Sequence, residues 1–400
     1  MLLSMKDKTK IEILQLVIAE KITVAEAARV LKRSERTVYR LCQRFTQKGL
    51  DGVLHGGRGK TNPRRTPQSL RERILTLVTG EYSNINDTHL TELLASREGI
   101  KIGRETLRQI LRGAGIAAKR RRRAPKYRTR RERKEAMGMM LQIDGSPHDW
   151  LEGRGPSMTL VGAKDDATGY TWAQFHPSET TWSYLELLEE IILSHGLPLS
   201  LYSDRHTIFY SPRAPTVLEQ IKNEPVRTQF GRAMEALDIR LIKAWSPQAK
   251  GRIEREWGFL QDRLVTHLRL ENACTMEEAN RVLKALLADF NQRFIVPAQF
   301  STPVFRKAPS KEALEQILCI RDQRVVSKDH SISFEGLTLQ IPPSKHFHSL
   351  AKRKVDVLQQ KDGRIQIFHQ DLLVAEFRPA SVTRMIDVLQ IDHLDLRKVA

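Results

Sequence analysis

Four short runs decide the fold of the central part of this chain: MGMMLQID (residues 137–144), SMTLVGAKDD (157–166), YTWAQFH (170–176) and LSLYSD (199–204). Their alternation of apolar and polar residues predicts β-strands. A helical period over residues 182–194 separates the third run from the fourth. Three strands, a helix and a fourth strand are the order that an RNase H-like α/β core would show.

Two of these runs end in an aspartate, Asp144 in the first and Asp204 in the fourth. The carboxyl ends of strands are where the side chains of α/β sites gather. Two carboxylates on neighbouring strands repel each other unless a cation lies between them, and hard divalent cations prefer oxygen ligands. The pair therefore favours a divalent-metal site, although either aspartate alone would equally suit a turn or a helix cap.

A third acidic residue lies in WSPQAKGRIERE (residues 245–256), where the Ser-Pro pair predicts the start of a helix over about residues 249–268. Glu254 belongs to the early turns of this helix, between basic neighbours. Taken alone, such an acid would be an exposed ion-pair partner. Trp257 shares the register of the apolar face of the helix and is expected in the core.

The order of two strand-ending aspartates followed by SPxxKGRxER resembles the catalytic core of DDE transposases and retroviral integrases. The resemblance is to insertion-sequence transposases of the integrase-core class, the ISNCY-type group among them, and it spans most of the chain. It implies that Asp144, Asp204 and Glu254 are catalytic residues that bind two Mg²⁺ ions, which Mn²⁺ can replace. It also implies binding of double-stranded DNA at element ends and at a target, cleavage followed by strand transfer, and a homo-oligomer on DNA.

The interval between the second and third acids is 50 positions, longer than this family commonly shows. We attribute the excess to a surface insertion over residues 209–228, whose proline and polar content suits a loop. Asp165, Asp166 and Glu256 are rival ligands. The two aspartates fit a hairpin turn, and Glu256 would point to a different face of the helix from Glu254.

Further residues near the predicted site carry positive charge or can carry it. Lys243, Lys250 and Arg252 are expected to contact phosphates through their charge, without reading bases. His206, two residues after a predicted ligand, suits a proton shuttle or a phosphate contact, and a packed residue beside the strand end equally well.

A helix-turn-helix module is predicted at the N-terminal end. Apolar residues recur at helical spacing over residues 11–50, and Thr23 and Ser34 suit N-caps. The third helix carries the cations expected to meet DNA: Arg36, Arg40 and Arg44. A three-helix bundle with a basic face is the alternative.

Composition divides the chain into six parts. These are a helix-turn-helix domain (1–55), a basic linker (56–68), a second helical DNA-binding domain (69–118), a second basic linker (119–136), the catalytic core (137–308) and a C-terminal SH3-like β-barrel with a tail (309–400). The second linker contains four consecutive arginines expected to clamp phosphates: Arg120, Arg121, Arg122 and Arg123. The barrel is expected from period-2 runs around the turn signal KDG, residues 361–363.

The overall composition agrees with a nucleic-acid partner. Lys and Arg number 66 against 47 Asp and Glu, which gives a net charge of +19 and attracts polyanions. Three scattered cysteines form neither a disulfide framework nor a zinc pattern, and no run is long and apolar enough for a membrane helix. We therefore expect a protein of the bacterial cytoplasm, associated with the nucleoid.

Three other functions remain open from the sequence. An RNase H-like nuclease that only hydrolyses DNA would use the same acids. A DNA-binding regulator would explain the helix-turn-helix and the charge but would leave three acids without a purpose. A catalytically dead transposase would keep all of these features.

Overall fold

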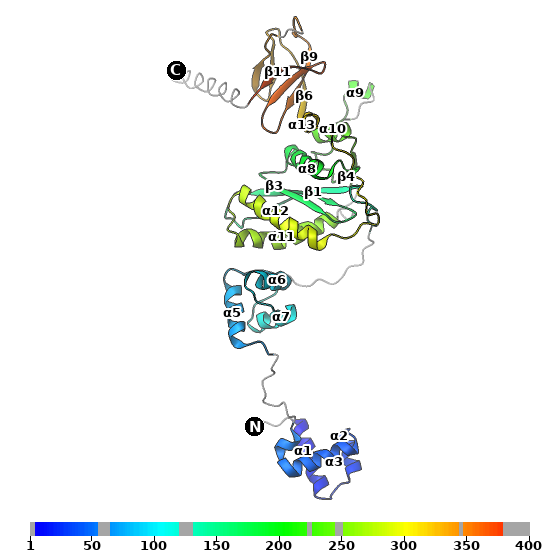
Figure 1. Ribbon diagram of the computed structural model, residues 1–400, viewed down its shortest axis with the longest axis vertical. Coiled ribbons are helices and arrows are strands. Elements are labelled where there is room, and N and C mark those ends of the chain that lie inside the picture. Colours follow the sequence, from blue (N-terminus) through cyan, green and yellow to red (C-terminus); the bar gives the residue numbers. More distant parts are fainter. Residues whose placement is uncertain are drawn as a thin grey trace, which may run out of the picture. The chain divides into compact units, whose positions relative to one another are not determined.

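The computed structural model describes residues 5–54, 65–119, 131–221, 226–244, 251–343 and 347–378 (Figure 1). The chain divides into two compact units, residues 1–76 and 77–400. None of the helices in these described ranges has the length and apolar character needed to cross a membrane.

The first unit begins with four helices: α1 (Met5–Ile18), α2 (Val24–Leu31), α3 (Glu35–Lys48) and α4 (Leu50–Val53). The predicted N-caps are confirmed, because the side chain of Thr23 accepts from Glu26 N and that of Ser34 accepts from Thr37 N. Leu14 and Val38 are fully buried between the helices. The short connection between α2 and α3 gives the predicted helix-turn-helix.

Three more helices follow: α5 (Gln68–Thr79), α6 (Asp87–Arg97) and α7 (Arg104–Gly113). Asn86 caps α6 by accepting a hydrogen bond from His89 N at 2.9 Å. The buried residues of α7, Leu107, Ile110 and Leu111, recur at helical spacing and pack inward. This is the second helical region that the sequence predicted.

A five-stranded mixed sheet forms the centre of the second unit: β1 (Leu141–His148), β2 (Met158–Asp165), β3 (Thr171–His176), β4 (Ser200–Ser203) and β5 (Arg240–Lys243). The strand order is β3-β2-β1-β4-β5. The first three strands pair antiparallel, whereas β4 and β5 run parallel to β1. Along the chain, three strands, helix α8 and a fourth strand follow in the order predicted for an RNase H-like core.

Helices cover both faces of this sheet. Figure 1 shows α8 (Thr181–His195) on one face and α11 (Gly251–Leu270) with α12 (Met276–Phe294) on the other. The side chains of β2 explain the two layers, because Val161 packs in the cluster that contains α8 and Leu160 packs in the cluster that contains α11. Successive residues of a strand point to opposite faces.

The first strand does not end at Asp144, as was expected from the sequence. It continues to His148, because antiparallel pairing with β2 persists from Asp144 opposite Gly162 to His148 opposite Met158. Its parallel pairing with β4 is recorded only at Leu141 and Gln142. Asp144 therefore lies inside a long hairpin strand and beyond its recorded pairing with the neighbouring parallel strand.

The predicted insertion over residues 209–228 is only partly a loop. It contains the short helix α9 (Val217–Ile221), and its first residue, Phe209, is 3% exposed and belongs to the core. Phe209 packs edge-on against Tyr184 and against Phe230 of α10 (Gln229–Ala236).

In the part of the C-terminal β-region that the structure describes, the strands do not form a closed barrel. After α13 (Lys311–Ile317) this part has six strands: β6 (Ile320–Val325), β7 (Ser331–Phe334), β8 (Leu337–Gln340), β9 (Lys354–Gln359), β10 (Ile365–His369) and β11 (Leu372–Phe377). They form an open four-stranded sheet, β11-β10-β9-β6, and a separate β7-β8 hairpin. The two sheets share one apolar core, so side-chain packing joins them without strand hydrogen bonds closing a ring. The turn at 361–363 lies between β9 and β10 as predicted.

Candidate active site

Asp144 and Asp204 lie at neighbouring positions of the central sheet. In the parallel β1-β4 pair, Leu141 is opposite Leu201 and Gln142 is opposite Tyr202. Continuing that register places Asp144 beside Asp204, which directly follows β4. Both side chains are half-buried. The pairing of these two acids stays a prediction, with which the recorded β1-β4 register agrees.

A buried tyrosine lies close enough to both aspartates and to a third acid for their charges to change its pKa. Tyr184 of α8 is 2% exposed and donates its hydroxyl proton to Glu179 Oε1 at 2.6 Å. Burial raises the pKa of Tyr184, and the negative charges of Glu179, Asp144 and Asp204 raise it further. The hydroxyl consequently stays protonated and remains a donor.

Glu179 is a site residue that was not predicted from the sequence. A Cβ atom on Gly145 would lie 2.6 Å from the carboxyl carbon of Glu179, so the acid occupies the space beside the glycine that follows Asp144. In the sequence Glu179 is only an acid just before the N-cap Thr180 of α8. The only sign of this contact in the sequence was Gly145, directly after Asp144, because a glycine leaves room for another side chain to approach closely.

Helix α11 reaches the first aspartate directly. The indole Nε1 of Trp257 donates to Asp144 Oδ2 at 2.9 Å. Trp257 is 6% exposed and packs in the core, as the sequence predicted. Its hydrogen bond to a candidate ligand was not predicted.

Glu254 and Glu256 of the same helix have different environments. Glu254 is exposed, whereas Glu256 is buried and forms an ion pair with Lys164 of β2. Two positions along a helix turn a side chain to another face. The rival Glu256 is therefore occupied with an ion pair to the sheet, in agreement with the expected difference between the two faces.

The other two rivals hold the β2-β3 turn together. Asp165 accepts from Gly138 N at 2.9 Å and from Thr168 N at 2.7 Å. Burial raises the pKa of Asp165 above its usual value. Asp166 has a completely buried side chain and pairs with Arg131 and Arg252. Their arginine hydrogen bonds outweigh the effect of burial and lower the pKa of Asp166.

The loop after Asp204 is ordered by that residue. Asp204 Oδ1 accepts from His206 N at 2.9 Å, and His206 Nδ1 accepts from Ile208 N at 3.3 Å. The imidazole of His206 is exposed. This placement is compatible with a phosphate contact.

The chemistry of the donor set suits the implied divalent ions. Asp144 and Asp204 supply the carboxylate oxygens that hard cations prefer, from adjacent strands. Within the described ranges, however, no three His, Cys, Asp or Glu side chains are gathered as a metal cluster. Glu254 lies one helical turn before Trp257, on the helix that touches Asp144. The two aspartates fit the ions in chemistry, and Glu254 would have to approach them to complete the set.

The predicted DNA contacts differ in their surroundings. Lys243 has its ammonium group 4.3 Å from the centre of the Tyr210 ring. Arg252 points to Asp166 and donates to Arg131 O, so its guanidinium stabilises the fold at this point. The three cations of α3, Arg36, Arg40 and Arg44, are exposed at helical spacing. Lys250 and the run from Arg120 to Arg123 lie outside the described residues.

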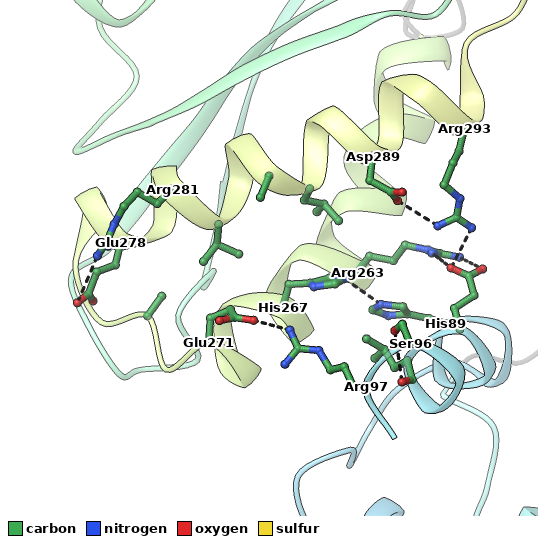
Figure 2. A pocket seen from close by; sticks show the side chains of 16 residues that line it. His89, Ser96, Arg97, Arg263, His267, Glu271, Glu278, Arg281, Asp289 and Arg293 are labelled. Atoms are coloured by element: carbon green, nitrogen blue, oxygen red, sulfur yellow. Dashed lines mark hydrogen bonds and ion pairs between the residues drawn. The ribbon is translucent and has the colours of Figure 1, made fainter. Parts of the chain in front are cut away.

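A cavity of about 730 Å³ lies away from these acids, between α6 and the helices α11 and α12 (Figure 2). Its walls carry both charges. Glu92 pairs with Arg263 at 2.6 Å and with Arg293 at 3.2 Å. At its base the Nε2 atoms of His89 and His267 lie 3.2 Å apart. Mixed charge and these ion pairs identify the cavity as part of the contact between the second helical region and the core.

Sequence comparison places the chain beside proteins of known type. The winged helix-turn-helix family matches residues 10–70. A putative transposase, y4bF, of Sinorhizobium fredii is 35% identical over 369 residues, which cover 91% of this chain and 79% of that protein. The transposase of the insertion sequence IS1202 of Streptococcus pneumoniae is 32% identical over 400 residues, which cover 91% of this chain and 84% of that protein.

Solved structures give looser likenesses. The catalytic core domain of BIV integrase matches 39% of this chain and 85% of its own, with 20% identity and a TM-score of 0.28. The simian T-cell lymphotropic virus intasome in complex with PP2A regulatory subunit B56 gamma matches 76% of this chain and 99% of its own, with 15% identity and a TM-score of 0.34. Because both TM-scores are low, the fold assignment rests on the strand order of this chain.

Proposed function

This chain belongs to the insertion-sequence transposases, and from that membership we propose that it cuts DNA at the ends of a mobile element and joins the cut ends to target DNA. The single observation that supports the chemical part is the parallel register of β1 with β4, which, continued by two residues, brings Asp144 next to Asp204. A DNA-binding regulator would leave these two carboxylates without a catalytic purpose.

Asp144, Asp204 and Glu254 are the proposed ligands of two Mg²⁺ ions, with Mn²⁺ as a substitute. Bound there, the ions would supply positive charge for the attacking and the leaving oxygens of an in-line displacement. The chain itself has to hold the carboxylates in position. Tyr184 contributes by keeping Glu179 hydrogen-bonded at the edge of the site.

Binding of double-stranded DNA is assigned to the basic parts of the chain. Arg36, Arg40 and Arg44 of α3 are proposed to contact an element end in the groove, and residues 120–123, Lys243 and Lys250 to contact phosphates. Arg252 also belongs to the predicted phosphate contacts, but its guanidinium pairs with Asp166, so we propose that it supports the DNA-binding surface without contacting a phosphate itself. Two ends must be held together for joining, so we propose a homo-oligomer on DNA, acting in the bacterial cytoplasm at the nucleoid.

For this function we propose the six-part division with boundaries at residues 55, 68, 118, 136 and 308. The helical parts would locate the element end, and the core would act on it. The C-terminal β-region keeps exposed cations at Lys352, Arg353 and Lys354, which suit contacts with a DNA backbone.

A gel assay distinguishes this proposal from a regulator or a dead copy. Full-length protein, Asp144→Asn and the control Asp149→Asn would be incubated with end-labelled DNA from the flanks of the gene, in Mg²⁺ or EDTA. Asp149 is exposed on the loop after β1, so its variant controls for loss of one nearby charge. We expect Mg²⁺-dependent cutting and joining by the wild type and the control, and binding alone by Asp144→Asn.

Two results would contradict the proposal. Binding without any reaction by the wild type would support a regulator or an inactive transposase. Cutting without joining to a target would support a nuclease that only hydrolyses DNA.

A further inference from the structure

Three polar contacts fix helix α11 on the β1-β2 hairpin. Arg252 pairs with Asp166 just after β2, Glu256 pairs with Lys164 of β2, and Trp257 donates to Asp144 of β1. Glu254 lies among these residues in the helix. The rotation and the height of α11 over the sheet are therefore set at the turn that carries the third proposed ligand.

The place of the indole depends on a glycine directly opposite the first aspartate. Gly162 of β2 faces Asp144 of β1 in the antiparallel register. A Cβ atom on Gly162 would lie 2.5 Å from Cη2 of Trp257 and 2.8 Å from the carbonyl oxygen of Trp172. Any side chain at this position would displace the indole from the strand pair. Gly162 therefore provides the space in which Trp257 reaches Asp144.

An indole has chemical properties that suit this position. Its N–H is a donor only and carries no charge, so it can orient a carboxylate without neutralising it. A lysine or arginine in the same place would compete with a cation for the carboxylate. A carboxylate has about four lone-pair directions, so one hydrogen bond is compatible with binding a cation as well.

We propose that Trp257 is a positioning residue for the metal site, and that Gly162 provides the space that its indole occupies. The indole N–H sets the orientation of the Asp144 carboxylate, and the same side chain fixes the turn of α11 that carries Glu254. This inference rests on the proposed function, because it assigns Asp144 and Glu254 to metal binding. It is separate from core packing, which Trp257 shares with its neighbours.

Trp150 offers a matched control. It is 1% exposed, lies in the same apolar cluster, and donates its indole N–H to Ser146 O of β1 at 3.2 Å. Trp150→Phe and Trp257→Phe thus remove the same atoms from the same core, and each removes one indole hydrogen bond to β1. Only the second variant removes the bond to Asp144.

The test uses the full-length chain and Mn²⁺ as the probe. The rise in melting temperature on adding Mn²⁺ and the rate of end cleavage would both be measured against Mn²⁺ concentration. For Trp257→Phe we expect half-saturation at about 10-fold higher Mn²⁺ in both measurements, the effect of losing a hydrogen bond to a charged group. For Trp150→Phe we expect a lower melting temperature with unchanged half-saturation.

The variant Gly162→Ala tests whether the indole needs the space that this glycine leaves on β2. It should raise the Mn²⁺ requirement of the wild type. It should raise it less in the Trp257→Phe background, where the methyl group still meets the carbonyl oxygen of Trp172 but no longer meets the indole. Equal Mn²⁺ half-saturation in Trp257→Phe and Trp150→Phe would overturn the proposal. Asp144→Asn is included because, if it keeps both the Mn²⁺ response and cleavage, the proposed site itself is wrong.

Discussion

At the level of single residues, two glutamates compete for the third position of the site. Glu254 is exposed on α11, one turn before Trp257, whereas Glu179 lies against Gly145 beside Asp144. We expect Glu254→Gln to slow end cleavage at least about 100-fold through the loss of a charged ligand. Glu179→Gln should cost no more than about 10-fold, since it keeps the hydrogen bond with Tyr184. Single-turnover cleavage rates would decide, and the reverse order would make Glu179 the ligand.

Asp166 is predicted to stabilise the fold without taking part in the chemistry. Its buried carboxylate accepts from Arg131 and Arg252, which are 42% and 22% exposed. Asp166→Asn should therefore lower the free energy of unfolding by about 2 kcal/mol, less than for a fully buried pair. Asp322→Asn, which breaks an exposed pair with Arg324, should cost less than about 0.5 kcal/mol. Urea unfolding would compare the two, and equal losses would contradict the prediction.

The residues of the proposed site differ in how well their roles could be predicted from the sequence. Asp144 and Asp204 could be selected because each follows an apolar run, and the expected role of Asp165 and Asp166 in a turn agrees with their contacts. The bond between Trp257 and Asp144 joins positions 113 apart. No local pattern encodes such a contact, because it depends on how α11 is placed on the sheet.

At the level of elements, α3 is expected to supply the main contact with an element end. Replacing Arg36, Arg40 and Arg44 with alanine should weaken end binding and reduce the slope of log K against log salt by up to about 3. The helix itself should persist, because all three side chains are exposed. Lys6→Ala with Lys8→Ala on α1 removes exposed charge elsewhere in the same unit. Fluorescence anisotropy would measure both slopes, and equal changes would argue against recognition by α3.

The contact between α6 and α11 is expected to weaken in acid. Burial lowers the pKa of His89 to about 3, with repulsion from His267 and Arg263 added, and burial also lowers the pKa of His267. Arg97 also opposes a charge on this pair, whereas Glu92, Asp262, Glu271 and Asp289 favour it. Both histidines are therefore neutral when folded, while the unfolded chain takes up protons below about pH 6.5.

The sign follows from the greater proton uptake of the unfolded chain. The free energy of unfolding should fall as the pH drops below about 6.5, by up to about 1.4 kcal/mol per pH unit for each histidine, and should go on falling towards the folded pKa values. His89→Asn with His267→Asn should flatten this dependence, whereas His348→Asn at an exposed position should not. Melting temperatures between pH 7 and pH 5 would test it, and parallel curves for wild type and double variant would refute it.

Elements were predicted better than their edges. Both N-caps of the first unit, and the sequence of three strands, a helix and a fourth strand around α8, follow from local patterns. The end of β1 was misplaced, because pairing with β2 extends the strand through the polar residues Gly145 and Ser146. The barrel was wrong for a similar reason, since period-2 runs predict strands but not which strands pair.

At the level of the whole molecule, a net charge of +19 and two helical regions ahead of the core suit the proposal that this chain acts on DNA. The three proposed metal ligands lie on β1, after β4 and on α11, whereas the cations proposed to contact the element end lie on α3. This separation keeps binding and chemistry on different residues, so loss of one should leave the other intact.

The most direct test of this account is strand transfer into a supercoiled plasmid by the Asp204→Asn variant. The charge-matched control is Asp371→Asn. Asp371 lies in an exposed turn with a left-handed backbone conformation, which asparagine can also adopt. The account predicts that Asp204→Asn binds element ends with wild-type affinity and yields no joined product in Mg²⁺, while Asp371→Asn joins normally. Joined product from Asp204→Asn at the wild-type rate would contradict the assignment of chemistry to this site.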